Sequence, residues 1–390
     1  MARRLTVVQM LPALESGGVE RGTLEIGRGL VAAGHRSIVI SAGGRMVEQL
    51  TAEGSEHVAW DVGRKRLTTL RWIPKLRRLL ADERVDVVHL RSRLPAWIGY
   101  LAWRGMDSES RPRLVTTVHG FYSVSRYSAI MTRGERVIAV SEAIRDYVLQ
   151  NYPDVDPARI EVIHRGIDPE QFPRGFRPSA DWLSSWQAEF PQLDGKRVLT
   201  LPGRLTRLKG HADFLELIAT LRREGREVHG LIVGEAQAGK EDYAAQLRDR
   251  VVELGLEADV TFAGHRDDMR EIYAVSEAVL SLSTQAESFG RTVAEALAIG
   301  TPVIGYASGG VGEILRRFYP EGVVGPGGIE ALADRARSLL DGAMPQVELP
   351  VDWTLARMVA STLELYEKVC VMPASQVGGG VGGMLGRHGE

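Results

Sequence analysis

This chain contains almost no cysteine, and this scarcity indicates the cellular compartment in which we expect the protein. The 390 residues include a single cysteine, Cys370, so no disulfide can form within the chain. Disulfides are typical of secreted domains and rare in a reducing cytoplasm. We therefore expect a cytoplasmic protein that is stabilised by its packed core.

Long apolar runs are also absent. No uninterrupted run approaches the roughly 20 apolar residues that a membrane-spanning helix requires. The segment Met1-Ala2-Arg3-Arg4 leads directly into the apolar stretch 5–11, which is too short and wrongly flanked for a secretory signal peptide. We expect any membrane contact to be peripheral, on the cytoplasmic face of an inner membrane.

Two common ligand signatures are missing. No G-x-G-x-x-G follows the first predicted strand, which makes an NAD-dependent dehydrogenase the least favoured interpretation. Asp154 and Asp156 form an Asp-x-Asp pair, but they lie in a loop between Pro153 and Pro157. No group of histidines, cysteines and carboxylates has metal-ligand spacing, so we expect no metal and no cofactor.

The composition that remains is that of a soluble globular protein. Hydrophobic residues make up 44% of the chain and charged residues 25%, both ordinary values. A chain of this length suits two domains better than one core. Short apolar stretches that predict strands alternate with predicted helices along much of the chain.

The small net charge conceals an asymmetry. Residues 1–168 hold 25 Lys and Arg against 19 Asp and Glu, hence +6, and the remainder holds 23 against 31, hence −8. The predicted helix 68–80 places Leu70, Ile73, Leu76, Leu79 and Leu80 on one face, and Arg71, Lys75, Arg77 and Arg78 on the other. Such a helix is either packed with a solvated back or lies on an anionic membrane or phosphorylated acceptor.

The most informative stretch is 278–313. An apolar strand at 278–283 is followed by a polar loop, a helix at 290–299 and a second strand at 302–306, which together predict a βαβ unit. Ligands of such units bind outside the carboxyl ends of the strands. Glu287 precedes the helix, Glu295 lies about two turns inside it, and the amides of Ser288, Phe289 and Gly290 would form an anion site at the helix N-terminus.

A second loop has the chemistry of a diphosphate site. The strand 197–201 is followed by Gly203, Arg204 and, five residues later, Lys209. An arginine fork combined with a lysine point charge can hold a diphosphate without a metal ion.

These two stretches closely resemble the donor-sugar site of retaining GT-B glycosyltransferases of family 4. The resemblance extends from Leu5 to about Cys370 and implies the GT-B fold, with two Rossmann-like, doubly wound α/β domains of parallel sheets that face a cleft. It implies transfer of a hexosyl unit from a nucleotide diphosphate sugar, UDP- or GDP-linked, to an anionic glycan or glycolipid acceptor, with no nucleic-acid partner. The donor is a substrate, and the implied enzyme needs no metal.

The resemblance also assigns roles to individual residues. His119, Glu287, Arg204 and Lys209 would be catalytic: Glu287 holds sugar hydroxyls, His119 positions or polarises the sugar, and the two cations face the diphosphate. Glu295 would hold the ribose. The full set of implied donor-binding residues is Gly17, Gly18, Gly203, Gly234, Glu235, His265, Ser288, Phe289, Gly290 and Glu295.

The acceptor side is less well defined. Arg91 and Arg93, in what we predict to be a cleft loop after a strand, and Ser141 are the expected acceptor-side residues. The segment 91–97 looks like members that build lipopolysaccharide core, which would supply a phosphorylated sugar acceptor. The linker departs from the family pattern, because His164-Arg165 replaces the more usual Pro-Asn.

The expected domains are an acceptor-side domain at 1–168, a donor-binding domain at 169–350, a helix at 351–370 that returns to the first domain, and a flexible glycine-rich tail at 371–390. Two alternatives stay open. A hydrolysing nucleotide-sugar epimerase shares the two-domain plan, and a non-catalytic scaffold would bind the donor without turnover.

Overall fold

The computed structural model describes residues 3–15, 17–236, 239, 241–345, 347 and 352–372. These residues form two compact units. Unit 1 comprises residues up to Arg165 together with those from Leu355 onward, and unit 2 comprises Gly166–Thr354. The chain therefore leaves unit 1 after Arg165 and re-enters it at Leu355.

Unit 1 is built on a seven-stranded parallel sheet. The strand order across the sheet is β3(Glu56–Ala59), β2(Arg36–Ser41), β1(Thr6–Met10), β4(Val87–Leu90), β5(Arg113–Val118), β6(Arg136–Ala139) and β7(Ile160–Val162). In register, Val7 lies opposite Ser37 on one side and Val87 on the other. The order reverses between β1 and β4, so the loops that follow these two strands meet at a topological switch point.

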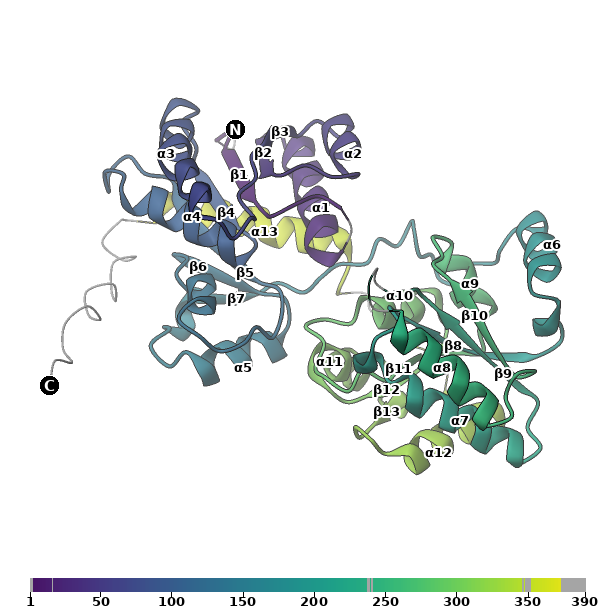
Figure 1. The fold of residues 1–390 in the computed structure, drawn as a ribbon. Helices are drawn as coiled ribbons and strands as arrows, with labels where there is room; N and C mark the ends of the chain where they lie inside the picture. Colours follow the sequence, from purple (N-terminus) through teal and green to yellow (C-terminus); the bar gives the residue numbers. More distant parts are fainter. Residues whose placement is uncertain are drawn as a thin grey trace, which may run out of the picture. The chain divides into compact units, whose positions relative to one another are not determined.

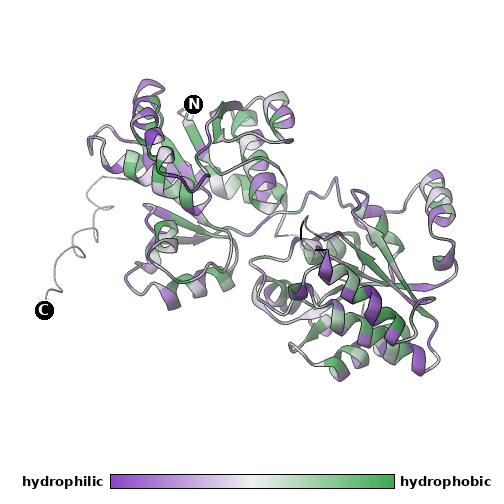
Figure 2. Ribbon diagram, in the orientation of Figure 1, coloured by the Kyte–Doolittle hydropathy of each residue, from purple (hydrophilic) through white to green (hydrophobic). Residues whose placement is uncertain are grey.

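Helices cover this sheet, as Figure 1 shows. The central strands are short runs rich in valine and isoleucine because both faces are buried. Figure 2 shows them green, with purple on the outer sides of the helices. The helices of unit 1 are α1(Gly18–Ala32), α2(Val47–Ala52), α3(Trp72–Asp82), α4(Arg93–Arg104), α5(Glu142–Asn151) and α13(Leu355–Val371).

Helix α13 is an integral part of unit 1. Its buried face, with Leu365 and Val369, joins a core that includes Val7 and Val87 of the sheet. The hydroxyl of Tyr366 lies 2.6 Å from Nδ1 of His89 on β4, and Nε2 of His89 lies 2.6 Å from the Thr117 hydroxyl on β5. Because all three side chains are buried, these polar contacts fix the helix to the sheet.

Unit 2 has a six-stranded parallel sheet in the order β10(Val260–Gly264), β9(Val228–Val233), β8(Arg197–Pro202), β11(Ala278–Ser281), β12(Val303–Tyr306) and β13(Val323–Val324). Its switch point lies between β8 and β11. The helices are α6(Ala180–Glu189), α7(His211–Arg223), α8(Asp242–Glu253), α9(Met269–Val275), α10(Arg291–Ile299), α11(Gly309–Phe318) and α12(Ile329–Leu340). Both units confirm the predicted doubly wound α/β class.

The basic helix differs from its prediction. The chain forms a 3₁₀ segment at Leu67–Arg71 before α3 begins at Trp72, and Leu70, expected in the core, is 50% exposed. Trp72 is buried instead. A 3₁₀ segment has three residues per turn rather than 3.6, so the side chains around it point in directions different from those of one continuous α-helix.

Three further boundaries differ. Helix α10 begins at Arg291, so Glu295 is its fifth residue, little more than one turn inside rather than two. The first segment of unit 1 ends at Arg165, three residues before the predicted boundary at 168. Unit 2 ends at Thr354, four residues after the predicted boundary at 350. Trp353 accounts for the second shift, because it is buried in unit 2 against Phe289 and Phe318. Residues 373–390 of the predicted tail lie outside the described residues, while Val371 ends α13.

Candidate functional site

The loops after β8 and β11 converge at the switch point of unit 2. The Lys209 ammonium lies 2.7 Å from Oε1 of Glu287, although 78 residues separate them in sequence. Both side chains are about three-quarters buried, with 27% and 25% exposed. The hydroxyl of Ser283 also donates to Glu287. Two residues predicted from separate motifs therefore form one ion pair.

Gly210 brings Lys209 to this place. It adopts φ +73°, and a Cβ built on it would lie 2.0 Å from the carbonyl oxygen of Leu282, just beyond β11. Only glycine allows this left-handed turn to approach the neighbouring loop so closely. The turn then leads into α7 at His211.

Arg204 is exposed, unlike Lys209 and Glu287. Among the described residues, its guanidinium makes no ion pair or side-chain hydrogen bond, whereas Arg207 in the same loop contacts Gln246 and the ring of Tyr243. Gly203 packs against the Lys209 side chain, where a Cβ would lie 3.2 Å from its Cδ. Of the three cations in this loop, Lys209 and Arg207 have partners, and Arg204 has none among the described residues.

The ends of β9 and β10 adjoin this loop. Leu205 donates its backbone N–H to the carbonyl oxygen of Glu235 at 3.0 Å, and Gly234 abuts the carbonyl of Gly203. Glu235 and His265 are exposed, and the amide of His265 lies 3.3 Å from Oε1 of Glu235. These predicted donor-binding residues therefore share one edge of the sheet with Lys209 and Glu287.

The Ser288-Phe289-Gly290 segment precedes α10 as predicted. Gly290 occupies the N-cap position of the helix. The Phe289 ring is buried 5.7 Å from Trp353, so only its backbone can serve a ligand. The backbone N–H of Gly310 donates to the carbonyl of Glu287 at 2.8 Å, which fixes the loop from the side of α11.

Glu295 is less accessible than the prediction implied. It is 6% exposed, and the hydroxyl of the buried Tyr273 lies 3.4 Å from its Oε2. Its ribose contact stays a prediction.

Helix α6, whose role could not be read from the sequence, supports the loop that carries His265. Trp182 stacks on Trp186 at 5.0 Å and donates from Nε1 to Asp268 at 2.9 Å. Asp268 in turn pairs with Arg266 at 2.7 Å, and the Arg266 guanidinium lowers the pKa of that carboxyl. Tryptophans at i and i+4 indicated a packed face, but nothing in the sequence identified the partner.

The polar residues of unit 1 gather at its own switch point. Gly17 is the N-cap of α1, and a Cβ on it would lie 2.8 Å from the carboxylate of Glu20. Burial raises the pKa of Glu20, which is near Arg91. Gly18 begins the helix and has open space around it.

The expected acceptor-side residues prove to be more structural than predicted. The segment 91–97 is not a loop, because α4 begins at Arg93. Arg91 is 2% exposed and donates to Oε1 of Gln9 at 2.9 Å. Arg93 stacks 4.7 Å from the ring of Tyr122. Ser141 is buried and caps α5 by accepting from the amide of Ile144 at 3.2 Å. Acceptor contacts for these three stay predictions.

His119 lies directly after β5 with an unusual partner. Nη2 of Arg165, which follows β7, is 2.6 Å from its Nδ1. Burial, followed by the charges of Arg165 and Arg91 and by His89, lowers the pKa of His119 well below the ordinary value. Nε2 is buried without a hydrogen-bond partner in the described part of the chain. The only signal for Arg165 in the sequence was its departure from the family pattern.

Family models match both halves of the chain: Glycosyltransferase Family 4 over residues 16–171 and Glycosyl transferases group 1 over residues 185–354. The chain belongs to glycosyltransferase family 4. This family 4 chain has neither a described helix long and apolar enough to cross a bilayer nor, among the same residues, a cluster of His, Cys, Asp and Glu suited to a metal ion.

Individual family 4 relatives are moderately distant. A D-inositol 3-phosphate glycosyltransferase of Mycobacteroides abscessus is 31% identical over 235 residues, 55% of this chain and 50% of the relative. The chain thus spans about half the length of the curated relatives it matches.

Solved structures match over more of the chain. A Rickettsia africae glycosyltransferase has a TM-score of 0.83 at 27% identity, covering 94% of this chain and 99% of its own. An Anabaena protein solved with UDP and glucose has a TM-score of 0.73 at 20% identity, covering 96% and 97%. The likeness of the latter concerns the fold alone.

Proposed function

We propose that this chain transfers a hexosyl unit from a UDP- or GDP-linked sugar to an acceptor hydroxyl, with retention at the anomeric carbon and without a metal ion. The observation that carries the proposal is the Lys209–Glu287 pair at the switch point of unit 2, beside the exposed Arg204. A cation and a carboxylate held together match the two ends of a sugar diphosphate. One end is anionic, and the other is a ring of hydroxyl donors.

The main energetic task is to stabilise the departing diphosphate. Arg204, Lys209 and the amides of 288–290 would face negative charge that grows as the glycosidic bond breaks. Preorganised donors of this kind contribute most in the transition state, and the loss of one typically costs about 2.7–4 kcal/mol, or 10²–10³ in turnover. Glu287 would accept from sugar hydroxyls while its bond to Lys209 keeps both groups in position.

Other residues complete the donor site in this proposal. Glu295 would hold the ribose, and the loops at Gly234-Glu235 and His265 would border the base. In unit 1, the Nε2–H group of His119 would donate to the transferred sugar near Gly17 and Gly18. Departure and attack on the same face of the sugar, through a short-lived ion pair, would give retention without a covalent intermediate.

The acceptor in this proposal is anionic. Lipopolysaccharide core was the expectation from segment 91–97, whereas the D-inositol 3-phosphate glycosyltransferase relative is named for a phosphorylated cyclitol. Both are phosphorylated polyols. Inositol 3-phosphate and a phosphorylated core oligosaccharide, each against its dephosphorylated form, would distinguish the two.

The test combines binding and turnover. UDP, GDP and NAD are titrated calorimetrically into the wild type, Arg204→Ala, Lys209→Ala and the control Arg207→Ala, whose guanidinium is already engaged by Gln246 and Tyr243. We expect one nucleoside diphosphate to bind, with affinity falling in Arg204→Ala and Lys209→Ala only. Binding of NAD alone, or equal effects of all three variants, would contradict the proposal.

Turnover with the matching nucleotide sugar separates the alternatives. Transfer that needs an acceptor, keeps the anomeric configuration by NMR and persists in EDTA supports the proposal. Product without any acceptor would indicate the epimerase, and donor binding without turnover would indicate a scaffold. Inversion, or loss of activity in EDTA that Mg²⁺ or Mn²⁺ restores, would refute those parts of the mechanism.

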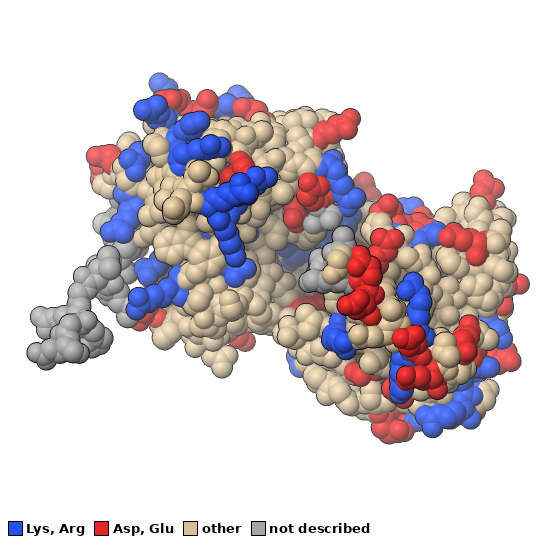
Figure 3. Space-filling view, viewed as in Figure 1, with Lys and Arg blue, Asp and Glu red and all other residues tan. Residues whose placement is uncertain are grey.

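We further propose that an exposed surface on unit 1 binds anionic lipid. This α3 patch consists of the exposed residues Arg64, Lys65, Arg66, Leu67, Leu70, Arg71, Lys75 and Arg78. Leu67 is 88% exposed, and Arg71 and Lys75 lie 4.8 and 4.9 Å from the ring of Trp72. Figure 3 shows Lys and Arg side chains over this part of unit 1.

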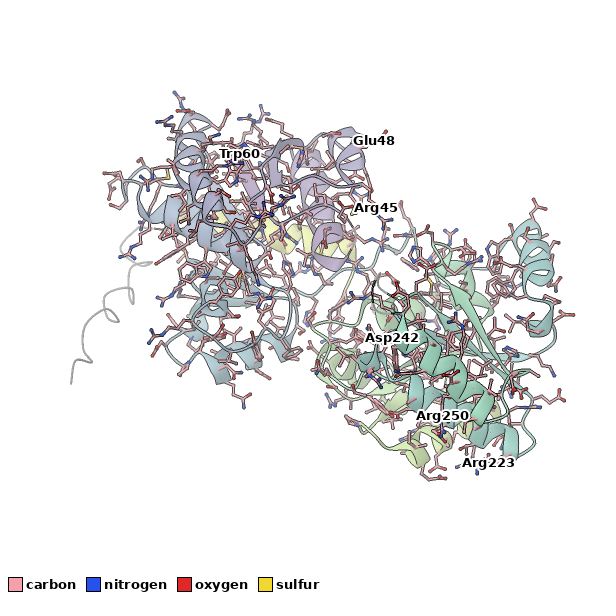
Figure 4. All side chains as sticks on the ribbon, viewed as in Figure 1. Arg45, Glu48, Trp60, Arg223, Asp242 and Arg250 are labelled. Atoms are coloured by element: carbon pink, nitrogen blue, oxygen red, sulfur yellow. The ribbon has the colours of Figure 1, made fainter. Side chains whose placement is uncertain are left out.

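Its base is rigid, because Trp72 stacks on Trp60, labelled in Figure 4, at 4.9 Å. Each basic residue near an anionic surface contributes about 1 kcal/mol, and exposed leucines add apolar burial.

Co-sedimentation with phosphatidylglycerol vesicles tests this surface. We expect binding that weakens with salt and falls in Leu67→Ser and Lys65→Glu. Val252→Ser is the control, since Val252 is 60% exposed on α8 of unit 2. Equal binding to neutral phosphatidylcholine vesicles, or loss in the control as well, would argue against the patch.

A further inference from the structure

The contact between Arg165 and His119 determines which form of the imidazole exists. A guanidinium has only N–H donors, so Nη2 of Arg165 must donate to Nδ1 of His119 across the 2.6 Å contact. Nδ1 is therefore the acceptor, and the proton of the neutral ring lies on Nε2. That Nε2–H group is buried and has no partner among the described residues, so it is available to a ligand oxygen.

The surroundings of the ring disfavour a second proton. Arg91, which is 2% exposed, adds positive charge near the ring, and His89 faces the same region. Below the ring, the His119 amide lies 3.3 Å from the Tyr122 hydroxyl, and Arg93 stacks on Tyr122.

The carboxylates of α1 whose charges interact with Arg91 are Glu25 and the half-buried Glu20. An imidazolium at this site would have to give up the Arg165 hydrogen bond and meet two cations.

The fold makes room for Arg165 specifically. A Cβ on Gly22 of α1 would lie 2.0 Å from Nη1 of Arg165 and 3.1 Å from Nη2 of Arg91. Arg165 is 8% exposed, and with Arg91, His89 and Thr117 it lines one internal cavity of unit 1. The missing side chain at Gly22 leaves space for the Arg165 guanidinium, so this arginine is packed inside unit 1 rather than lying on its surface.

We propose that Arg165 is a positioning residue that holds His119 as the neutral Nε2–H tautomer, so that the ring presents a hydrogen-bond donor without a charge. The identity of the receiving oxygen, a hydroxyl of the transferred sugar, rests on the proposed function. The tautomer itself does not. Because Nδ1 is occupied by a donor, His119 keeps this form through mildly acidic conditions in which a free histidine takes a second proton.

The direct test is ¹⁵N NMR of the imidazole nitrogens in protein labelled at histidine, from pH 8 to pH 5, with His119→Gln to assign the signal. We expect wild-type His119 to show an N–H at Nε2 and an unprotonated Nδ1 throughout. In Arg165→Met, we expect mixed tautomers and a titration midpoint that moves toward the ordinary value of about 6.5. Arg165→Lys, which restores a donor, should recover the wild-type pattern at least in part.

Two further variants separate contact from charge. Arg91→Met removes the other buried cation without touching Nδ1, so the tautomer should be kept. Gly22→Ala should displace the Arg165 guanidinium and reproduce Arg165→Met, which supplies the test if Arg165→Met does not fold. An unchanged Nε2–H tautomer in both Arg165→Met and Gly22→Ala would overturn the proposal, as would a change of tautomer in Arg91→Met.

Activity measurements then separate this inference from the proposed function. In an active transferase, the acidic limb of kcat/KM should move up in pH in Arg165→Met, with UDP affinity unchanged. If the wild type neither binds a nucleoside diphosphate nor transfers a sugar, the proposed function fails while the NMR result stands. If transfer is normal and its pH profile is identical in Arg165→Met, the positioning role fails while the function stands.

Discussion

Substitution of Gly210 by alanine tests the architecture of the unit 2 site, and the chain supplies its own control. Gly210 and Gly225 are at opposite ends of α7 and have almost the same backbone angle, φ +73° and +75°. A Cβ at Gly225 meets nothing within 4 Å, whereas a Cβ at Gly210 would lie 2.0 Å from the carbonyl oxygen of Leu282. The two variants therefore share the backbone strain and differ only in the collision.

The magnitudes follow from this geometry. A left-handed conformation costs an L-residue about 1–2 kcal/mol, which both variants should show as lost unfolding free energy. Relief of the collision requires movement of the Lys209–Gly210 turn, and an overpacked site adds about 1–3 kcal/mol. We expect Gly225→Ala to lose about 1–2 kcal/mol and Gly210→Ala about 2–5 kcal/mol. Because Lys209 moves with the turn, only Gly210→Ala should also bind nucleoside diphosphate more weakly, by about 10-fold for each 1.4 kcal/mol of binding free energy lost.

Urea unfolding followed by tryptophan fluorescence measures the first effect, and calorimetric titration with UDP or GDP measures the second. Hydrogen exchange at 278–283 would locate the disturbance at the end of β11. Equal destabilisation of the two variants, together with unchanged nucleotide affinity in Gly210→Ala, would refute both the close approach and its link to Lys209.

Three other outcomes are expected. Tyr366→Phe should destabilise unit 1 by about 1–3 kcal/mol, because it leaves the buried Nδ1 of His89 without its partner. Hydrogen exchange at β4 should rise, and no rise would contradict the α13 contact. Burial lowers the pKa of His211 to about 4, so its contribution to stability is complete above pH 6.5 and is lost as the pH falls toward 4. His211→Leu should therefore flatten the acid loss of stability by up to about 3 kcal/mol, and an unchanged acid loss would contradict this. Trp353→Ala should cost about 3–5 kcal/mol in urea unfolding of unit 2, and a cost below about 1 kcal/mol would contradict its packing between Phe289 and Phe318.

Local patterns were sufficient for most of the architecture. The strand predicted at 197–201 begins with β8 and ends one residue before it, and the strand predicted at 302–306 differs from β12 by one residue. The βαβ unit around Glu287 was predicted with its loop and helix in the right order. The buried face of α3 was not predicted correctly, because the 3₁₀ segment before it changes which residues point toward the core.

Contacts between residues distant in sequence could not be predicted. Lys209 and Glu287 each belonged to a motif, yet the ion pair between them depends on β8 and β11 being neighbours in the sheet. The contact of Arg165 with His119 depends likewise on where β5 and β7 end. Ser141 shows that a residue of a functional motif can also cap a helix, which the motif alone does not reveal.

The return of α13 to unit 1 has a consequence for biosynthesis. Unit 2 is one continuous segment, so it can reach its native contacts as soon as its own residues have left the ribosome. Unit 1 cannot complete its core until residues near Tyr366 have been made. Until then, His89 and the apolar faces of β1 and β4 stay uncovered. The first half of the nascent chain is thus the last to be completed, and it is the half for which chaperone protection during translation would matter most.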